Sequence, residues 1–266
     1  MDIFTLPNRN LVTHILEYLP YRDIAKLSYI NRKFNLLCLN EPLIKTLIVT
    51  KRTDHLLQKH SQSHLALEDA CSYGDLEVVN ELINRGVDPS LNENNALKIS
   101  IEYNRITSIK RLLIDPRVDP SFESWALNLA IEHNRSDIVQ ILLRDIRICE
   151  QIRESELLIQ ACRRGNTELC RLLVEHVNPA RRDNQSIISV AFQGHVEIVD
   201  LLLKQKEVDP TARDNGAIAW VNVEIERGSE KHGEVMKRLL EDERVYWSLS
   251  EDARSKYRLM GDLLWK

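Results

Sequence analysis

Apolar residues recur along most of the chain as paired blocks with helical spacing. In the first block of each pair, an apolar residue is followed three and four positions later by small or apolar residues on the same helix face. The second block carries apolar doublets one turn apart, such as Val78-Val79 and Leu82-Ile83. The pattern predicts successive pairs of short helices. The first-block triplets are Leu67, Ala70 and Cys71; Leu97, Ser100 and Ile101; Leu127, Ala130 and Ile131; Leu158, Ala161 and Cys162; and Ile187, Val190 and Ala191.

A residue that tolerates positive φ follows each first block. Glycine and asparagine end helices in a left-handed cap, so they predict a sharp turn between the two helices of a pair. A helix end that recurs every 29 to 31 residues is typical of stacked-repeat proteins, which more often bind partners than catalyse reactions. The residues are Gly74, Asn104, Asn134, Gly165 and Gly194.

An acidic or hydroxyl residue opens each second block, and a proline turn follows most of them. Carboxylates suit the positive end of a helix dipole. An Asp or Asn before Pro favours a turn, because the residue before proline avoids helical backbone angles. The turns are Asp88-Pro89, Asp119-Pro120, Asn178-Pro179 and Asp209-Pro210.

This arrangement resembles the ankyrin repeat over residues 65–246, most clearly in the stretch from Ala191 to Leu203. We expect about six repeats, starting near 65, 95, 125, 156, 185 and 216. The sixth, Ala217–Val245, has Ile225 at the turn position, so its first helix is predicted to end later, at Gly228. Only seven residues separate Pro89 from Leu97, which implies shortened hairpin loops and little or no β structure. The predicted fold class is therefore all-α, with an ankyrin-repeat solenoid.

The first 46 residues do not follow the repeat and predict a three-helix bundle. A helical stripe runs from Leu11 to Leu19 and stops at Pro20, and apolar residues continue from Ile24 to Leu39. The segment carries more large apolar residues than so small a bundle can bury. An F-box is resembled by the strings Leu6-Pro7, Ile15-Leu16, Tyr18-Leu19-Pro20, Arg22-Asp23-Ile24, Leu27-Ser28, Asn31-Arg32-Lys33-Phe34-Asn35, Leu37-Cys38 and Pro42-Leu43-Ile44.

The F-box resemblance implies docking onto a Skp-type adaptor and, through it, onto a cullin–RING ubiquitin ligase. An extra residue between Leu6-Pro7 and Ile15-Leu16 departs from the family pattern, as does Arg9 at a usually acidic position. The alternative is a helical cap that only covers the first repeat. The residues that the resemblance assigns to the adaptor are Leu6, Pro7, Ile15, Leu16, Leu19, Pro20 and Leu27.

We predict four segments: an F-box-like domain over residues 1–46, a helical connector over 47–64, the ankyrin repeats over 65–246 and a C-terminal capping helix over 247–266. The connector carries His60 and His64 on one helix face, but a solvated linker is a better interpretation than a metal site. We expect no metal and no cofactor.

Composition narrows the function further. The formal net charge of −4 argues against nucleic-acid binding, and no apolar run is long enough to span a membrane. The first residues lack the pattern of a signal peptide. Three of the five cysteines, Cys71, Cys162 and Cys170, fall at core positions, which favours reduced thiols in the cytoplasm, with the nucleus left open.

In the ankyrin arrangement, the two residues before each turn lie on the inner, concave face. Tyr and Arg, which are frequent at binding hot spots, stand among them. The charged residues among them change along the chain from acidic to basic. We therefore expect a protein segment with the opposite order of charges, and with apolar anchors, to bind there. The alternative is that these are ordinary solvated helix ends. The predicted target-binding residues are Tyr73, Glu102, Tyr103, Glu132, His133, Arg163, Arg164, Phe192 and Gln193.

The sequence contains no phosphate loop and no hydrolase or metalloprotease motif, so we predict that the chain is not an enzyme. The resemblances imply a substrate-recruiting adaptor of a Skp–cullin–F-box ubiquitin ligase. The alternative is an ankyrin protein that binds or sequesters its target with no ligase link. An F-box-like segment followed by ankyrin-like repeats is similar to the ankyrin/F-box families of large DNA viruses and intracellular bacteria. Those proteins are thought to redirect host ubiquitination.

Overall fold

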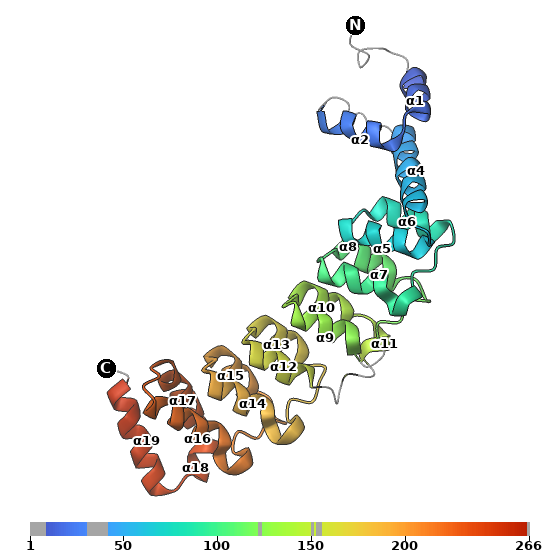
Figure 1. The fold of residues 1–266 in the computed structure, drawn as a ribbon. Coiled ribbons are helices and arrows are strands. Elements are labelled where there is room, and N and C mark those ends of the chain that lie inside the picture. The colour runs from blue at the N-terminus through green and yellow to red at the C-terminus, as the bar shows by residue number, and fades with distance from the viewer. Residues whose placement is uncertain (1–8, 31–41, 122–123, 150–151, 153–155, 265–266) are drawn as a thin grey trace. The chain divides into compact units, whose positions relative to one another are not determined.

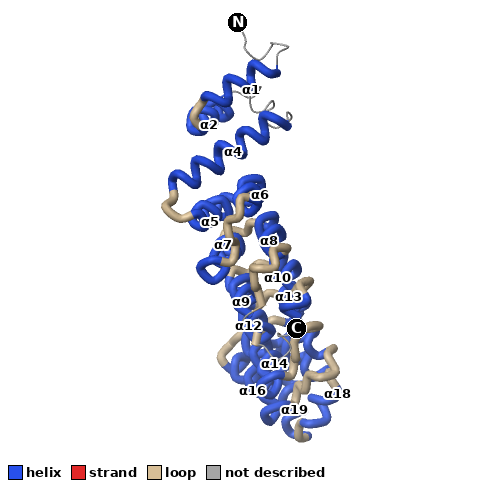
Figure 2. Tube along the Cα trace, turned by 90° about the vertical axis from the view of Figure 1, so that its right-hand side faces the viewer, coloured by secondary structure: helices blue, strands red, loops and turns tan. Residues whose placement is uncertain are grey.

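The described part of the protein consists of helices and loops. A computed structural model describes residues 9–30, 42–121, 124–149, 152 and 156–264, with only the backbone of 9–12, 27–30 and 258–264. Contacts divide the chain into two compact units, residues 1–119 and 120–266, which are described separately. No strand occurs in the described ranges (Figure 2), so the all-α prediction is confirmed.

Among its described residues, the first unit holds two helix pairs preceded by α1, α2 and α4 (Figure 1). First helices contact each other from pair to pair, as do second helices, and α4 contacts both helices of the first pair. The three leading helices are α1 (Arg9–Tyr18), α2 (Tyr21–Ile30) and α4 (Pro42–Lys59). The pairs are α5 (Ser63–Tyr73) with α6 (Leu76–Asn84), and α7 (Leu91–Glu102) with α8 (Ile106–Leu113).

The second unit continues with four helix pairs in two layers. An inner layer contains α9 (Trp125–Glu132), α12 (Leu157–Arg164), α14 (Arg181–Gln193) and α16 (Ala212–Glu226). An outer layer contains α10 (Ser136–Leu142), α13 (Thr167–Leu173), α15 (Val196–Leu203) and α17 (Lys231–Glu241). The remaining helices are α11 (Ile146–Cys149), α18 (Glu243–Ser248) and α19 (Glu251–Leu264).

The core lies between the helices of neighbouring pairs, where the sequence places it. Leu67, Leu97, Leu127, Leu158 and Ile187 are all buried, with at most 1% of their surface exposed. A leucine of this kind contributes about 1.5–3 kcal/mol when it is buried. One pair alone has too few partners to bury both helices, so the stability of each repeat depends on its neighbours.

The five predicted turn residues all adopt the left-handed conformation. Gly74, Gly165 and Gly194 have φ of 74°, 68° and 77°, and Asn104 and Asn134 have φ of 55° and 57°. The chain therefore reverses directly between the helices of a pair. In the sixth repeat α16 ends late, and Gly228 at φ 89° makes the turn, as the sequence predicts.

The shortened hairpin loops form left-handed turns instead of β structure. Three consecutive residues have positive φ in each of three loops, residues 92–94, 182–184 and 213–215. The asparagine that ends the turn reaches the next proline turn. Asn184 Oδ1 accepts the Asp209 N–H at 2.8 Å, and Asn94 Oδ1 accepts the Asp119 N–H at 3.2 Å. A side-chain hydrogen bond thus links neighbouring repeats where a longer finger is absent.

Three of the proline turns are Asx turns. The Asp88, Asn178 and Asp209 side chains accept the N–H two residues later, at 2.9 to 3.0 Å. A second column of turns, unpredicted from the sequence, joins Asp115 to Arg117 and Asp145 to Arg147 through both the backbone N–H and the guanidinium. These ion pairs hold the pKa of both carboxyls below its usual value.

The helix α4 connects the leading helices to the first repeat. Its Lys51 ammonium donates to the Glu17 and Leu19 carbonyls at 2.7 and 2.9 Å, which satisfies the end of α1. Its Arg52 forms an ion pair with Asp75 at 2.5 Å, at the start of α6. The predicted connector helix therefore packs on both sides, but it begins at Pro42, inside the predicted F-box-like domain.

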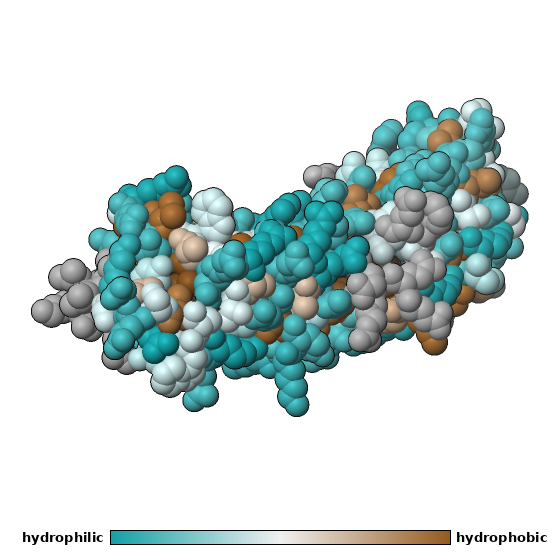
Figure 3. Space-filling model, turned by 90° about the horizontal axis from the view of Figure 1, so that it is seen from below, coloured by the Kyte–Doolittle hydropathy of each residue, from teal (hydrophilic) through white to brown (hydrophobic). Residues whose placement is uncertain are grey.

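None of the described helices combines the length and the hydropathy that crossing a bilayer requires. The face drawn in Figure 3 is largely hydrophilic, and its hydrophobic side chains form small, separate patches.

Gly165 is predicted to be required for two physical reasons. Its φ of 68° lies in the left-handed region, which alanine and most other residues adopt only with strain, and a Cβ at this position would collide with the ring of His195 from the next repeat. Gly228 has φ 89° but open space around it. We expect Gly165→Ala to lower the free energy of unfolding by about 2–4 kcal/mol and Gly228→Ala by about 1 kcal/mol. Urea denaturation measures the free energy of unfolding of both variants. Equal losses for Gly165→Ala and Gly228→Ala would contradict the close approach of His195 to Gly165.

The asparagine link is tested with glycine, which tolerates positive φ. Asn184→Gly removes the hydrogen bond to Asp209 and leaves its N–H unsatisfied, so we expect a loss of about 1 kcal/mol. The neighbouring Asp183 is exposed at φ 51°, and Asp183→Gly is expected to be neutral or stabilising. Urea denaturation of both variants gives the comparison, and a neutral Asn184→Gly would refute the link.

Candidate functional site: a pocket on the inner helices

The predicted adaptor residues divide into buried and exposed side chains. Leu16 is 1% exposed and forms a small core with Ile24 and Ile44, against which Leu19 packs. In this conformation Leu16 stabilises the leading helices, so it is not an accessible anchor. Its assignment to the adaptor remains a prediction that would require the three helices to separate.

The other predicted adaptor residues are accessible or lie beyond the description. Ile15 is 41% exposed, and Pro20 is exposed at the junction between α1 and α2. Leu6 and Pro7 lie outside the described residues, and the side chain of Leu27 is not described. Ile15 and Pro20 are therefore the predicted contacts that a partner can reach directly.

In the first unit, the predicted target-binding residues lie at the ends of α5 and α7. Tyr73 is 68% exposed and Tyr103 is 56% exposed, and Glu102 beside Tyr103 is also exposed. Two phenol rings at equivalent places in successive repeats give this unit an accessible aromatic surface. Their role in binding remains a prediction.

In the second unit, the equivalent residues divide between two roles. Glu132 and His133 are exposed at the end of α9. Arg164 is exposed, but its Nη1 donates to the Glu132 carbonyl at 3.1 Å, so it links α12 to α9. Arg163, Phe192 and Gln193 instead gather around one pocket.

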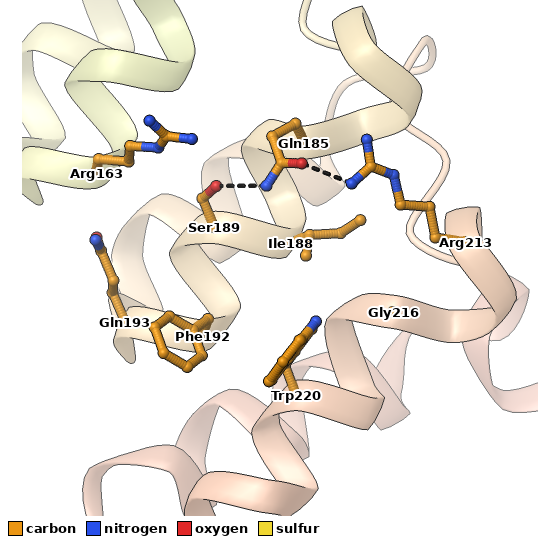
Figure 4. Close-up of a pocket in the computed structure, with 9 residues that line it drawn as sticks. All are labelled: Arg163, Gln185, Ile188, Ser189, Phe192, Gln193, Arg213, Gly216 and Trp220. Carbon is orange, nitrogen blue, oxygen red and sulfur yellow. Dashed lines mark hydrogen bonds between the residues drawn. The ribbon is translucent and has the colours of Figure 1, made fainter.

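This pocket has a volume of about 520 Å³ and is formed by α12, α14 and α16 (Figure 4). Volumes of this order are typical of sites that bind small molecules or side chains. Its lining residues are Arg163, Gln185, Ile188, Ser189, Phe192, Gln193, Arg213, Gly216 and Trp220.

An aromatic pair forms one wall of the pocket. The Phe192 and Trp220 rings lie edge to face, with centroids 5.6 Å apart and an interplanar angle of 79°. Both side chains are accessible, at 43% and 48% of their surface, and Ile188 lies buried above them in Figure 4. Edge-to-face packing holds the rings in place while leaving faces open to a ligand.

The opposite wall is polar and positively charged. Gln185 donates to Ser189 at 3.0 Å and accepts from Arg213 at 2.7 Å. Arg213 also donates to the Arg182 carbonyl at 2.8 Å, so its guanidinium is held in place. Arg163 is exposed, and within the described chain it makes no hydrogen bond or ion pair.

Three of the nine lining residues, Arg163, Phe192 and Gln193, belong to the pairs of positions just before each turn. Gln185 and Ser189 lie seven and three residues before Phe192, on the same face of α14, and so fall outside those pairs. Trp220 stands in the sixth repeat where Ser189 stands in the fifth. The positions one and two helical turns earlier on the same face of each first helix include Trp220.

Cys71 and Cys162 show no feature of a nucleophile. Cys71, Cys162 and Cys170 are fully buried, as predicted. Burial raises the pKa of Cys71 to about 11. The hydrogen bond between Cys162 and Cys170, whose sulfurs are 3.6 Å apart, raises the pKa of Cys162 together with burial. Thiols of this kind remain protonated at neutral pH.

His60 of the connector makes a structural contact. His60 Nε2 lies 3.1 Å from Asp69 Oδ2, which also accepts from Lys59 at 2.6 Å. Although burial opposes it, these hydrogen bonds lower the pKa of Asp69. Within the described ranges, no three His, Cys, Asp or Glu side chains are grouped as metal ligands.

Comparison with known proteins agrees with the helix pairs and their turns. The family described as "Ankyrin repeats (3 copies)" matches residues 64–152 and 127–214, which together make up more than half of the chain. The protein therefore belongs to the ankyrin-repeat family, whose members are in general non-enzymatic protein-binding modules. No curated protein matches the chain, and the family match does not include the first 63 residues.

The buried thiols predict a labelling pattern. With iodoacetamide at pH 8, Cys71 and Cys162 of the native protein are expected to stay unmodified, since both are buried and have raised pKa values. In urea both are expected to react. Peptide mass mapping measures the modification, and rapid labelling of native Cys162 would show an accessible thiolate.

Proposed function

We propose that the protein recruits a target protein to a Skp–cullin–F-box ubiquitin ligase. In this proposal the leading helices dock a Skp-type adaptor, and the ankyrin repeats bind the target on their inner helices. The reaction itself belongs to the partners. The chain contributes proximity, because it holds the target near the ubiquitin carrier and raises its effective concentration.

The observation that supports docking is the apolar surface of the leading helices. The described apolar core of α1, α2 and α4 consists of Leu16, Ile24 and Ile44, while Ile15, Tyr18 and Leu43 are 41%, 78% and 74% exposed. Large apolar side chains exposed together on a small module are typical of a partner-binding surface. An adaptor that covers them would gain the burial that the three helices cannot supply themselves.

The structure also supports a rigid relation between this surface and the first repeat. Besides the Arg52–Asp75 pair, α4 forms ion pairs through Lys45 with Glu77 and through Asp54 with Arg85. A fixed helix between the docking surface and the first repeat would limit the freedom of a bound target relative to the adaptor. This is the property that a proximity mechanism requires.

The alternative function is a binding or sequestering module without a ligase. The family match supports this reading, because it includes the repeats and not the leading helices. Under it, Ile15, Tyr18 and Leu43 serve no adaptor. Either function is compatible with the cytoplasm, which remains our proposed compartment.

Adaptor binding is tested with exposed residues, because replacing Leu16 would disrupt the small core. We expect Ile15→Asp combined with Tyr18→Asp to lower co-purification of a Skp-type adaptor at least tenfold, since two carboxylates would have to be desolvated in its groove. The far-ultraviolet circular dichroism should stay unchanged, because neither side chain is in the core.

The control is Ile114→Asp, which changes an isoleucine that is 77% exposed on the same unit, at the end of α8. It should leave adaptor binding intact. If the wild-type chain does not bind a Skp-type adaptor, the ligase proposal fails and the sequestering function replaces it.

A further inference from the structure

We infer that the pocket between α14 and α16 binds an internal acidic segment of the target protein. An apolar side chain of that segment enters beside Phe192 and Trp220, and an Asp or Glu carboxylate on the same segment pairs with Arg163. This inference deepens the proposed function, since it rests on target binding by the repeats.

The shape of the pocket depends on two residues of the sixth repeat. Gly216 stands where the preceding repeat has Gln185, and without a side chain it leaves the space open. A Cβ added there would lie 3.4 Å from Ile188 Cδ1, so anything larger would extend into the pocket. Trp220, which replaces a serine, then supplies an aromatic wall. The equivalent places on α14 hold the polar side chains of Gln185 and Ser189, so the sixth repeat differs from the fifth at both positions.

The charge of the pocket determines the class of occupant. Two guanidiniums, of Arg163 and Arg213, flank it from different helices, and no carboxylate is among its lining residues (Figure 4). Arg213 is already held by Gln185 and the Arg182 carbonyl. Arg163 has no partner within the described chain, so its donors are available. An arginine fork pairs with a planar carboxylate through two parallel hydrogen bonds.

The combination of aromatic wall and free arginine favours a peptide over a free anion. Tryptophan and arginine dominate binding hot spots because they bury a large area and still offer directed hydrogen bonds. An inorganic anion would use Arg163 but leave the rings exposed, and a purely apolar segment would leave the arginine unpaired. A segment with an apolar residue beside a carboxylate satisfies both.

The experiment selects random twelve-residue peptides, displayed as internal segments on phage, against the full chain. We expect the selected peptides to be enriched in Asp or Glu next to an aromatic or aliphatic residue. Synthetic amidated copies, measured by fluorescence polarisation, should bind Arg163→Glu and Trp220→Ala at least about tenfold more weakly than the wild type. Replacing the peptide carboxylate by Lys should restore binding to Arg163→Glu.

Two control variants make the same chemical changes away from the pocket. Arg171→Glu alters an exposed arginine of α13, and Trp247→Ala removes an exposed indole of α18. Both should bind the peptides like the wild type. Gly216→Leu, which fills the space without removing any group, should weaken binding.

Peptides without acidic enrichment, a selection that yields no binder, or unchanged binding by Arg163→Glu would each overturn the inference. So would binding that requires a free C-terminal carboxylate. Adaptor co-purification is read from Ile15 and Tyr18 on the other unit, so failure of the pocket and failure of the ligase proposal give different results.

Discussion

The structure depends on burying the apolar faces of each helix pair against the next pair. Buried residues such as Leu127, Leu158 and Ile187 lie on first helices that contact both their own second helix and the first helices of neighbouring repeats. Such packing requires the chain to reverse at the same place in every repeat, which explains the left-handed turn residues. At Gly165 the constraint is tightest, because the His195 ring of the next repeat occupies the space of a side chain.

The shortened loops shift the binding surface onto the helices. Without β-hairpin fingers, successive repeats are linked by asparagine side chains such as Asn184, and the inner helices are left accessible. In the second unit the accessible face includes an aromatic and positively charged pocket. Because the loops between repeats are short, they leave the inner helices accessible, and a partner can bind there.

The leading helices are stabilised by a small core of their own and not by stacked repeats. Their small core of Leu16, Ile24 and Ile44 is completed by α4, whose Lys51 also satisfies the end of α1. A module so small stays partly apolar on its surface, and Ile15, Tyr18 and Leu43 are the result. That surface and the inner-helix pocket belong to separate units, and each supports one half of the proposed function.

The sequence by itself determined the helix pairs, the positions of the turns, the absence of β structure in the described chain and the late end of α16. All of these follow from local periodicity and from the backbone freedom of glycine and asparagine. It could not decide which of two adjacent apolar residues, Ile15 or Leu16, faces inward, because both fit a helical stripe. Nor could it find the pocket, which joins Arg163, Phe192 and Trp220 from three repeats. Such a site exists only because stacking brings together side chains nearly thirty residues apart, and the depth of the space depends on a side chain that Gly216 lacks.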